Sequence, residues 1–278
     1  MERYACIVLL LICCSLTGIG QGYTYVGGGM DVQLFFSGEL DYVVKRYNLT
    51  RGSNHGDNSL VATEMNSPKL LIGPSLAAGV ALLNGMIPVE VNWTLGYGSA
   101  SGEVKNIFSE ETETPSPLKQ TVQLRNNSFK IGVGYNFIYA SKKYKQSVPI
   151  KLGIMVFGTF GTLKQLTKNS DLTDVVKNRN EQTGFYEVSS DFHAGISGAF
   201  NFQVTGKKSP VGMILRPYYQ FNFAKTDFSN LDKELNGTNA PDTNLNSNLS
   251  SFGIQLELTG QYWLSSSSSY KGKRRSLE

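Results

Sequence analysis

The side chains best placed for chemistry lie close together near residue 190. His193 follows Asp191 at a spacing of two, with Ser189 and Ser197 at the same parity. If this segment is a strand, one face carries an acid, a base and two hydroxyls, the groups that serine hydrolases use to activate a nucleophile. A histidine on a polar strand face more often makes hydrogen bonds inside a barrel. We expect that role for His193 and keep a hydrolase as an alternative.

Metal and thiol chemistry have little support in the sequence. The other histidine, His55, lies in a polar segment, and no carboxylates stand at metal-ligand spacing from either histidine. The three cysteines, Cys6, Cys13 and Cys14, all lie in one apolar N-terminal segment. We therefore expect no metal, no cofactor, no catalytic residue and no disulfide in the mature chain, and a function other than catalysis.

Residues 1–22 have the pattern of a secretory signal peptide. Arg3 precedes an apolar run at 5–14, and small residues follow at Gly18, Gly20 and Gly22. The run is about half the length that a spanning helix needs. The alternative is a lipoprotein signal that retains Cys13 or Cys14 as an acylated first residue, although Ile12 is bulkier than the residue that usually precedes such a cysteine.

Period-two alternation of apolar and polar residues predicts eight strands. The clearest begins at Asp31, with Val32, Leu34 and Phe36 on one face and Gln33 on the other, and the alternation runs to residue 45. The remaining predicted strands cover 69–82, 89–98, 128–139, 150–163, 188–204, 215–223 and 252–264. The segment 69–82 is apolar or small on both faces, and we count it because a barrel with both ends closed on one side needs an even number of strands.

The connections between these strands alternate in length. Long polar stretches at 46–67, 101–124, 165–185 and 225–249 alternate with short ones at 83–88, 140–148 and 205–211. This asymmetry predicts an all-β, eight-stranded antiparallel up-and-down transmembrane barrel over 23–264, with four long exposed loops without a core at one end. Both termini then lie at the other end. The serine-rich, basic tail at 265–278 is expected to be disordered.

The large side chains lie on the apolar face of the strands and the small ones on the polar face, which favours a membrane barrel over a soluble one. The apolar face carries Tyr97, Tyr135, Tyr139 and Tyr262 near strand ends, where an aromatic girdle belongs. The polar face is rich in Gly, Ser and Asn, which suits a narrow filled lumen. A soluble barrel such as a lipocalin would place its bulky face inside.

The leader, the eight amphipathic strands and the loop asymmetry together resemble the small bacterial outer-membrane barrel superfamily of the OmpA transmembrane domain, OmpX and opacity-type adhesins. The resemblance covers 23–264 and lies in architecture, without a specific motif. It implies a location in the bacterial outer membrane and contact with outer-membrane lipid. A net charge of +4 is too small to indicate nucleic acid binding.

Two functions follow from this architecture. The first is adhesion, in which the loops 46–67, 101–124, 165–185 and 225–249 bind a host or cell-surface ligand. The second is a narrow porin-like channel, because lumen glycines leave space that larger side chains would fill. These glycines are Gly132, Gly134, Gly153, Gly161, Gly195 and Gly253. An outer-membrane lipid-modifying hydrolase is the third and least favoured.

Strand parity also predicts a cluster of charges inside the barrel. Arg216, Glu257 and Glu39 should share the lumen at mid-height, because the strands that carry them become neighbours when the barrel closes. A buried guanidinium needs a carboxylate partner. Lys130 would balance the second acid, and Glu90 with Lys151 would form a second pair nearer the periplasm. The turn lysines Lys142, Lys143, Lys145, Lys207 and Lys208 are either solvated or in contact with anionic headgroups.

Overall fold

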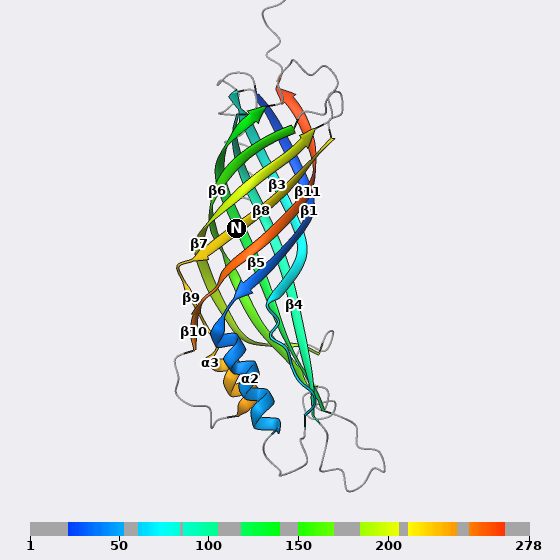
Figure 1. Ribbon diagram of the computed structural model, residues 1–278, viewed down its shortest axis with the longest axis vertical. Coiled ribbons are helices and arrows are strands. Elements are labelled where there is room, and N and C mark those ends of the chain that lie inside the picture. Colours follow the sequence, from blue (N-terminus) through cyan, green and yellow to red (C-terminus); the bar gives the residue numbers. More distant parts are fainter. Residues whose placement is uncertain are drawn as a thin grey trace, which may run out of the picture.

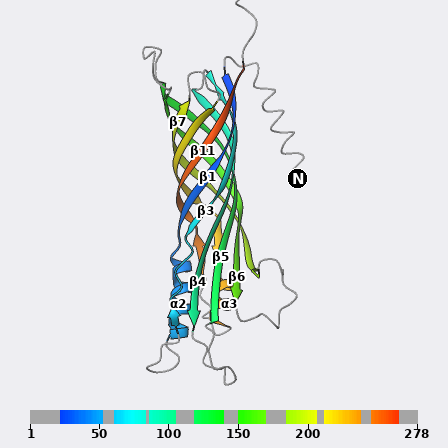
Figure 2. The same ribbon diagram turned by 90° about the vertical axis from the view of Figure 1, so that its right-hand side faces the viewer.

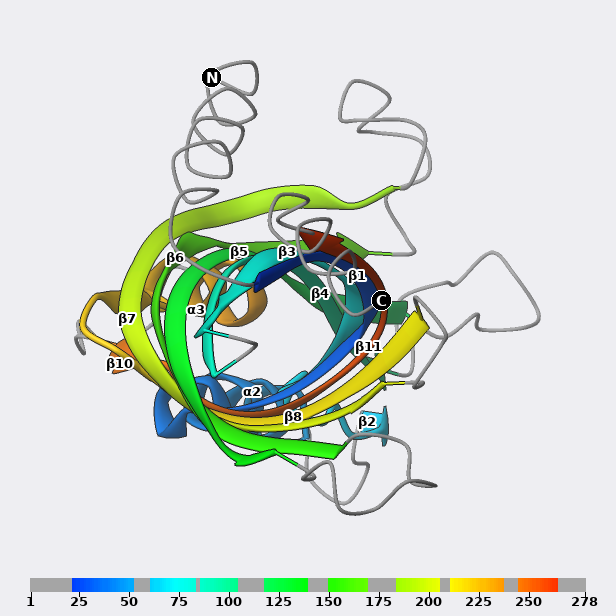
Figure 3. The same ribbon diagram turned by 90° about the horizontal axis from the view of Figure 1, so that it is seen from above.

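Eight long antiparallel strands close into a ring. The computed structural model describes residues 22–52, 61–83, 86–104, 118–139, 150–169, 184–205, 211–237 and 245–264. The ring contains β1 (Gly22–Phe36), β3 (Leu70–Leu82), β4 (Ile87–Val104), β5 (Leu118–Tyr139), β6 (Ile150–Asn169), β7 (Tyr186–Thr205), β8 (Val211–Asn222) and β11 (Ser250–Leu264). Each of these strands pairs with the next one in this order, and β11 pairs with β1, which closes the ring (Figures 1 and 3). The predicted eight-stranded up-and-down barrel is confirmed.

The outer face of the barrel is apolar and the inner face is polar. Outward side chains such as Val26, Ile131, Phe200 and Leu258 are 50% to 64% exposed, whereas polar residues of alternate parity are buried inside. An apolar belt of this extent is incompatible with a soluble surface and is the wall that a membrane-spanning barrel presents to lipid. A soluble barrel with its bulky face inside is therefore ruled out.

The first predicted strand is wrong in position. Strand β1 ends at Phe36, and residues 38–52 form the helix α2 (Gly38–Gly52). The Ser37 hydroxyl accepts a hydrogen bond from the Leu40 amide at 3.1 Å, which caps the helix. Four buried residues then follow helical spacing, at positions i, i+3, i+4 and i+7: Leu40, Val43, Val44 and Tyr47. The apparent alternation beyond residue 37 was helical periodicity.

The predicted long loops contain regular structure of their own. Strands β4 to β7 run 18 to 22 residues, so parts of 101–124 and 165–185 belong to the barrel wall, which extends beside the helices (Figure 2). Between β8 and β11 the chain forms β9 (Lys225–Asp227), α3 (Ser229–Asn236) and β10 (Asn246–Asn248), and β2 (Val61–Thr63) pairs with β4. In the described part of the chain, no helix is long and apolar enough to cross a membrane.

The helices lie at one end of the molecule, and the two ends of the described chain lie at the other. Gly22 and Leu264 are directly paired at that opposite end, which agrees with the predicted placement of the termini (Figure 1). The predicted leader at 1–22 lies outside the described residues except for Gly22, which begins β1. The tail at 265–278 and the turn lysines at 142–145 and 207–208 also lie outside the described residues.

Candidate functional site

The centre of the lumen is held by a buried ion pair between Arg216 on β8 and Glu90 on β4. The guanidinium donates two parallel hydrogen bonds to the carboxylate, 2.6 and 2.7 Å long. Both side chains are at most 1% exposed. The Tyr25 hydroxyl donates to the same carboxylate at 2.7 Å, and the Arg216 guanidinium carbon lies 5.2 Å from the ring centre of Phe157. Bidentate geometry and extra donors are what make a buried ion pair tolerable.

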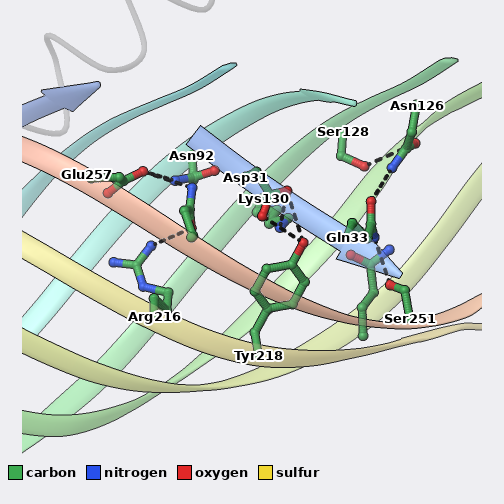
Figure 4. A network of polar contacts seen from close by, with 12 residues as sticks. Asp31, Gln33, Asn92, Asn126, Ser128, Lys130, Arg216, Tyr218, Ser251 and Glu257 are labelled. Atoms are coloured by element: carbon green, nitrogen blue, oxygen red, sulfur yellow. Dashed lines mark hydrogen bonds and ion pairs between the residues drawn. The ribbon is translucent and has the colours of Figure 1, made fainter. Parts of the chain in front are cut away.

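A second acid, Glu257 on β11, is joined to this pair through amides. Its carboxylate accepts hydrogen bonds from Asn92 at 2.9 Å and Gln255 at 2.8 Å, and the first of these is visible in Figure 4. Gln255 in turn accepts from Arg216 at 3.1 Å. The guanidinium and the two acids therefore form one network across three strands.

A further polar cluster, with Asp31 of β1 at its centre, contains a second lumen ion pair. The Tyr218 hydroxyl donates to both carboxylate oxygens of Asp31 at 3.0 and 2.9 Å. The Lys130 ammonium lies 4.0 Å from the same carboxylate and 3.9 Å from the Tyr218 ring centre (Figure 4). An aromatic face and a carboxylate together offset the cost of burying an ammonium.

The predicted lumen charges are only partly brought together as expected. Glu39 is not in the lumen, because it lies in the first turn of α2. Glu90 is bound by Arg216 instead of by Lys151. The Lys151 ammonium donates to the Tyr23 hydroxyl at 2.5 Å and lies over that ring. These pairings differ from the prediction because Tyr23 and Tyr25 belong to a strand that begins before the alternation used to place it.

Several network residues were not singled out from the sequence. The sequence does place Asp31, Asn92 and Tyr218 on the lumen face, since each lies at a position of its predicted strand that alternates with the apolar, outward-facing positions. Their partners were not evident because cross-strand neighbours depend on register, which alternation alone does not give.

The lumen glycines do not leave open space. A Cβ atom on Gly132 would lie 2.3 Å from the Phe157 ring, and one on Gly253 would lie 2.2 Å from the Tyr218 ring. At the other four predicted glycines, Gly134, Gly153, Gly161 and Gly195, a Cβ atom would lie 2.3 to 2.8 Å from a side-chain atom of Met155, Asn136, His193 or Asn222, and 2.1 to 2.6 Å from a backbone carbonyl oxygen of an adjacent strand. Neighbouring atoms already occupy the space beside each glycine, so the predicted vacancy is wrong.

His193 is buried without the acid expected beside it. Its Nε2 atom lies 2.8 Å from the Asn126 side-chain oxygen and 3.3 Å from the Ser128 hydroxyl. Asp191 instead accepts hydrogen bonds from Gln165 at 3.0 Å and Ser189 at 3.3 Å. The described groups therefore do not form a nucleophile, base and acid relay. Within the described ranges, no three histidine, cysteine or acidic side chains gather as a metal site.

An apolar core closes the helix end of the barrel. We call this assembly of α2, α3 and the strand extensions the cap. Its buried core comprises Phe35, Leu40, Val43, Val44, Tyr47, Met65, Leu71, Val122, Leu124, Leu163, Phe228, Leu231, Leu235, Leu245 and Leu249. Arg46 of α2 pairs with Asp232 of α3 at 2.8 Å. The Asn48 side chain makes two 3.0 Å hydrogen bonds to the Met65 backbone. The expectation of loops without a core is wrong here.

The ring register and the apolar wall define a small transmembrane β-barrel whose lumen is filled and whose helix end is capped. The structure is similar to that of Neisserial surface protein A (NspA), with a TM-score of 0.38 and 11% identity over 86% of this chain and 97% of that one. It is also similar to the outer membrane protease OmpT from Escherichia coli, with a TM-score of 0.28 and 8% identity over 87% and 96%. The sequence matches no protein-family model and no curated protein.

Proposed function

We propose that the protein is a surface protein of the bacterial outer membrane, in which a closed barrel anchors the cap and the cap binds a ligand on another cell or in host matrix. The observation that carries this proposal is the cap itself. Fifteen buried apolar residues order two helices over the barrel end, and a plain anchor or an open pore has no need of such an ordered assembly.

One face of α2 supplies a candidate contact surface. Tyr42 and Leu49 are 44% and 59% exposed, and Lys45 between them is exposed as well. These residues stand at i, i+3 and i+7 and so share one side of the helix, opposite the side that packs into the cap. Aromatic side chains such as that of Tyr42 are enriched in protein interfaces relative to the rest of the surface.

The test is adhesion of cells that display the full chain to wells coated with fibronectin, laminin or collagen. We expect retention above that of cells without the protein on at least one coating. The Tyr42→Ser, Leu49→Ser double variant should lose that retention, whereas a Glu64→Ser, Lys233→Ser control, which changes exposed polar cap residues, should keep it. Background adhesion on all three coatings, or full adhesion by the double variant, would contradict the proposal.

A narrow channel is the second candidate function. The filled lumen argues against it, because Arg216, Glu90, Phe157 and Tyr218 occupy the interior with large side chains. Eight strands enclose a space that side chains can fill completely. The conductance of the refolded protein in planar bilayers distinguishes the two functions, because a channel gives reproducible current steps and a closed anchor gives none.

A further inference from the structure

Four polar side chains meet where the barrel joins the cap, at the point where β7 lies beside β9 (Figure 1). They belong to Gln165 of β6, Ser189 and Asp191 of β7, and Asp227 of β9. The Gln165 side-chain nitrogen donates to the Asp191 carboxylate at 3.0 Å and to the Asp227 backbone oxygen at 2.8 Å. The Ser189 hydroxyl donates to the same Asp191 oxygen at 3.3 Å. This rim cluster joins the barrel sheet to the separate sheet of β9 and β10.

One buried oxygen of the rim cluster has no donor. Gln165 is 0% exposed, and its side-chain oxygen has no hydrogen-bond partner among the described residues. The nitrogen of the same planar amide is fixed between Asp191 and Asp227, so the unpartnered oxygen is held beside these two groups. A buried acceptor without a donor is costly. A bound cation would remove that cost.

The rim cluster carries two negative charges that no cation balances within the described ranges. Neither Asp191 nor Asp227 forms an ion pair there, and the charge of Asp227 acts unfavourably on the ionised Asp191 carboxylate. One Asp227 carboxylate oxygen accepts from the Ser229 amide at 2.8 Å, at the start of α3. Two neighbouring acids and an unpartnered amide oxygen are complementary to a cation that prefers oxygen ligands.

The spacing and the kinds of atom in the rim cluster fit Ca²⁺. This ion holds six to eight oxygens at about 2.3 to 2.6 Å, so that neighbouring ligand oxygens lie about 3 Å apart. The polar contacts of 2.8, 3.0 and 3.3 Å have this separation. A half-turn of the Gln165 amide exchanges its nitrogen and oxygen, which brings the oxygen into the same space. Ca²⁺ accepts amide and backbone oxygens as readily as carboxylates, so the site needs no third acid.

We propose that the rim cluster binds a calcium ion through the Asp191 and Asp227 carboxylates, the Gln165 side-chain oxygen and the Asp227 backbone oxygen, with water completing the shell. The ion links β7 to β9, and β9 leads directly into α3. Calcium therefore fixes α3 against the barrel. Mg²⁺ is a poor substitute, because it demands a tighter octahedral shell and gives up its water reluctantly.

The experiment uses the full chain refolded in a non-ionic detergent, freed of metal with a chelator and titrated calorimetrically with CaCl₂ or MgCl₂. The parent should bind Ca²⁺ with a Kd of about 10⁻⁴ to 10⁻³ M, as extracellular calcium modules do, and bind Mg²⁺ at least about tenfold more weakly. Asp191→Asn should weaken calcium binding about tenfold or more, because it removes a charged ligand. Glu64→Gln removes an exposed acid elsewhere on the cap and should stay within about twofold of the parent.

Gln165→Glu gives a test in the opposite direction. A carboxylate replaces the amide at nearly the same size, so calcium affinity should rise about tenfold if this side chain is a ligand. If Gln165 serves only as a hydrogen-bond donor to Asp191, the third acid should instead weaken the cluster and give no gain in affinity. Hydrogen exchange supplies a second readout, in which calcium should slow exchange in β9 and α3 of the parent and leave β3 unchanged.

Three results would overturn the proposal. The first is a parent that binds no Ca²⁺, or that binds Mg²⁺ as tightly. The second is parent-like calcium affinity in both Asp191→Asn and Gln165→Glu. The third is a Gln165→Glu variant that binds calcium more weakly than the parent. All of these are measured on purified protein, so a failure of cell adhesion is a separate result.

Discussion

Arg216 and Glu90 meet inside the barrel in two parallel hydrogen bonds, 2.6 and 2.7 Å long, from strands that are not neighbours in the ring. The pair therefore ties β8 to β4 across the lumen. Because both groups are at most 1% exposed, neither can exchange its partner for bulk water. The loss of one partner leaves a buried charge without compensation.

Arg216→Ala should lower the free energy of unfolding by about 3 to 5 kcal/mol, because Glu90 and Glu257 then remain as uncompensated acids in the lumen. The measurement is urea unfolding of the refolded barrel in lipid vesicles, followed by tryptophan fluorescence. A double variant, Arg216→Met with Glu90→Leu, removes both charges and should recover part of the loss.

The matched control is Lys164→Ala, which breaks the exposed ion pair between Lys164 and Glu187 at 2.6 Å. An exposed pair contributes about 0 to 1 kcal/mol. The account is wrong about burial if Arg216→Ala costs no more than this control.

A methyl group at Gly253 should destabilise the barrel, because its Cβ atom would lie 2.2 Å from the Tyr218 ring. Overpacking of this kind costs about 1 to 3 kcal/mol. Gly198→Ala is the control, since nothing lies within 4 Å of its Cβ position. Equal unfolding midpoints for the two alanine variants would show that the Tyr218 ring does not fill the lumen beside Gly253.

Leu231→Ala should loosen the cap without opening the barrel. Leu231 is fully buried in the cap core, and truncation of a buried leucine costs about 2 to 5 kcal/mol. Hydrogen exchange should show lost protection in α2 and α3 and unchanged protection in β8 and β11. Leu49→Ala, at a position that is 59% exposed, should change neither. Equal loss of protection in cap and barrel would show that the cap is not a separate cooperative unit.

Much of the barrel was predictable because the side chains of each strand alternate between facing the lipid and facing the lumen. That alternation fails where the chain leaves the membrane. The helix α2 was not predicted because Leu40, Tyr42 and Val44 continue the period-two alternation of β1, although the buried residues Leu40, Val43, Val44 and Tyr47 follow helical spacing. The start of β1 escaped prediction because Gly27, Gly28 and Gly29 resemble a turn, although a Cβ atom on Gly29 would lie 1.8 Å from the Leu256 carbonyl oxygen.

The sequence predicted which charged residues face the lumen better than it predicted which of them pair with one another. Strand parity pointed Arg216, Glu257, Glu90, Lys130 and Lys151 inward, and the structure places all five in the lumen. Which acid meets which cation depends on the stagger of strands around the ring, and a misplaced first strand shifts that stagger. Glu39 was assigned to the lumen because the first predicted strand was extended to residue 45, through what is the first turn of α2.

The filled lumen predicts a closed barrel in planar bilayers. The refolded parent should show no reproducible current steps, because aromatic and charged side chains occupy the interior. Arg216→Ala removes the largest fully buried side chain among the described residues and leaves two acids, so it should raise the conductance for cations. Reproducible steps from the parent would favour the channel over the anchor.

The central claim, a closed outer-membrane barrel that presents its cap outside the cell, is tested most directly by cysteine labelling of intact cells. Leu49→Cys stands on the exposed face of α2, and Leu83→Cys stands at the opposite end of the barrel, each at a position at least 50% exposed. The parent chain supplies the background, since its cysteines all lie within residues 1–21. A membrane-impermeant maleimide should label Leu49→Cys on intact cells and Leu83→Cys only after permeabilisation. Labelling of Leu83→Cys on intact cells, or of Leu49→Cys only after permeabilisation, would contradict the account.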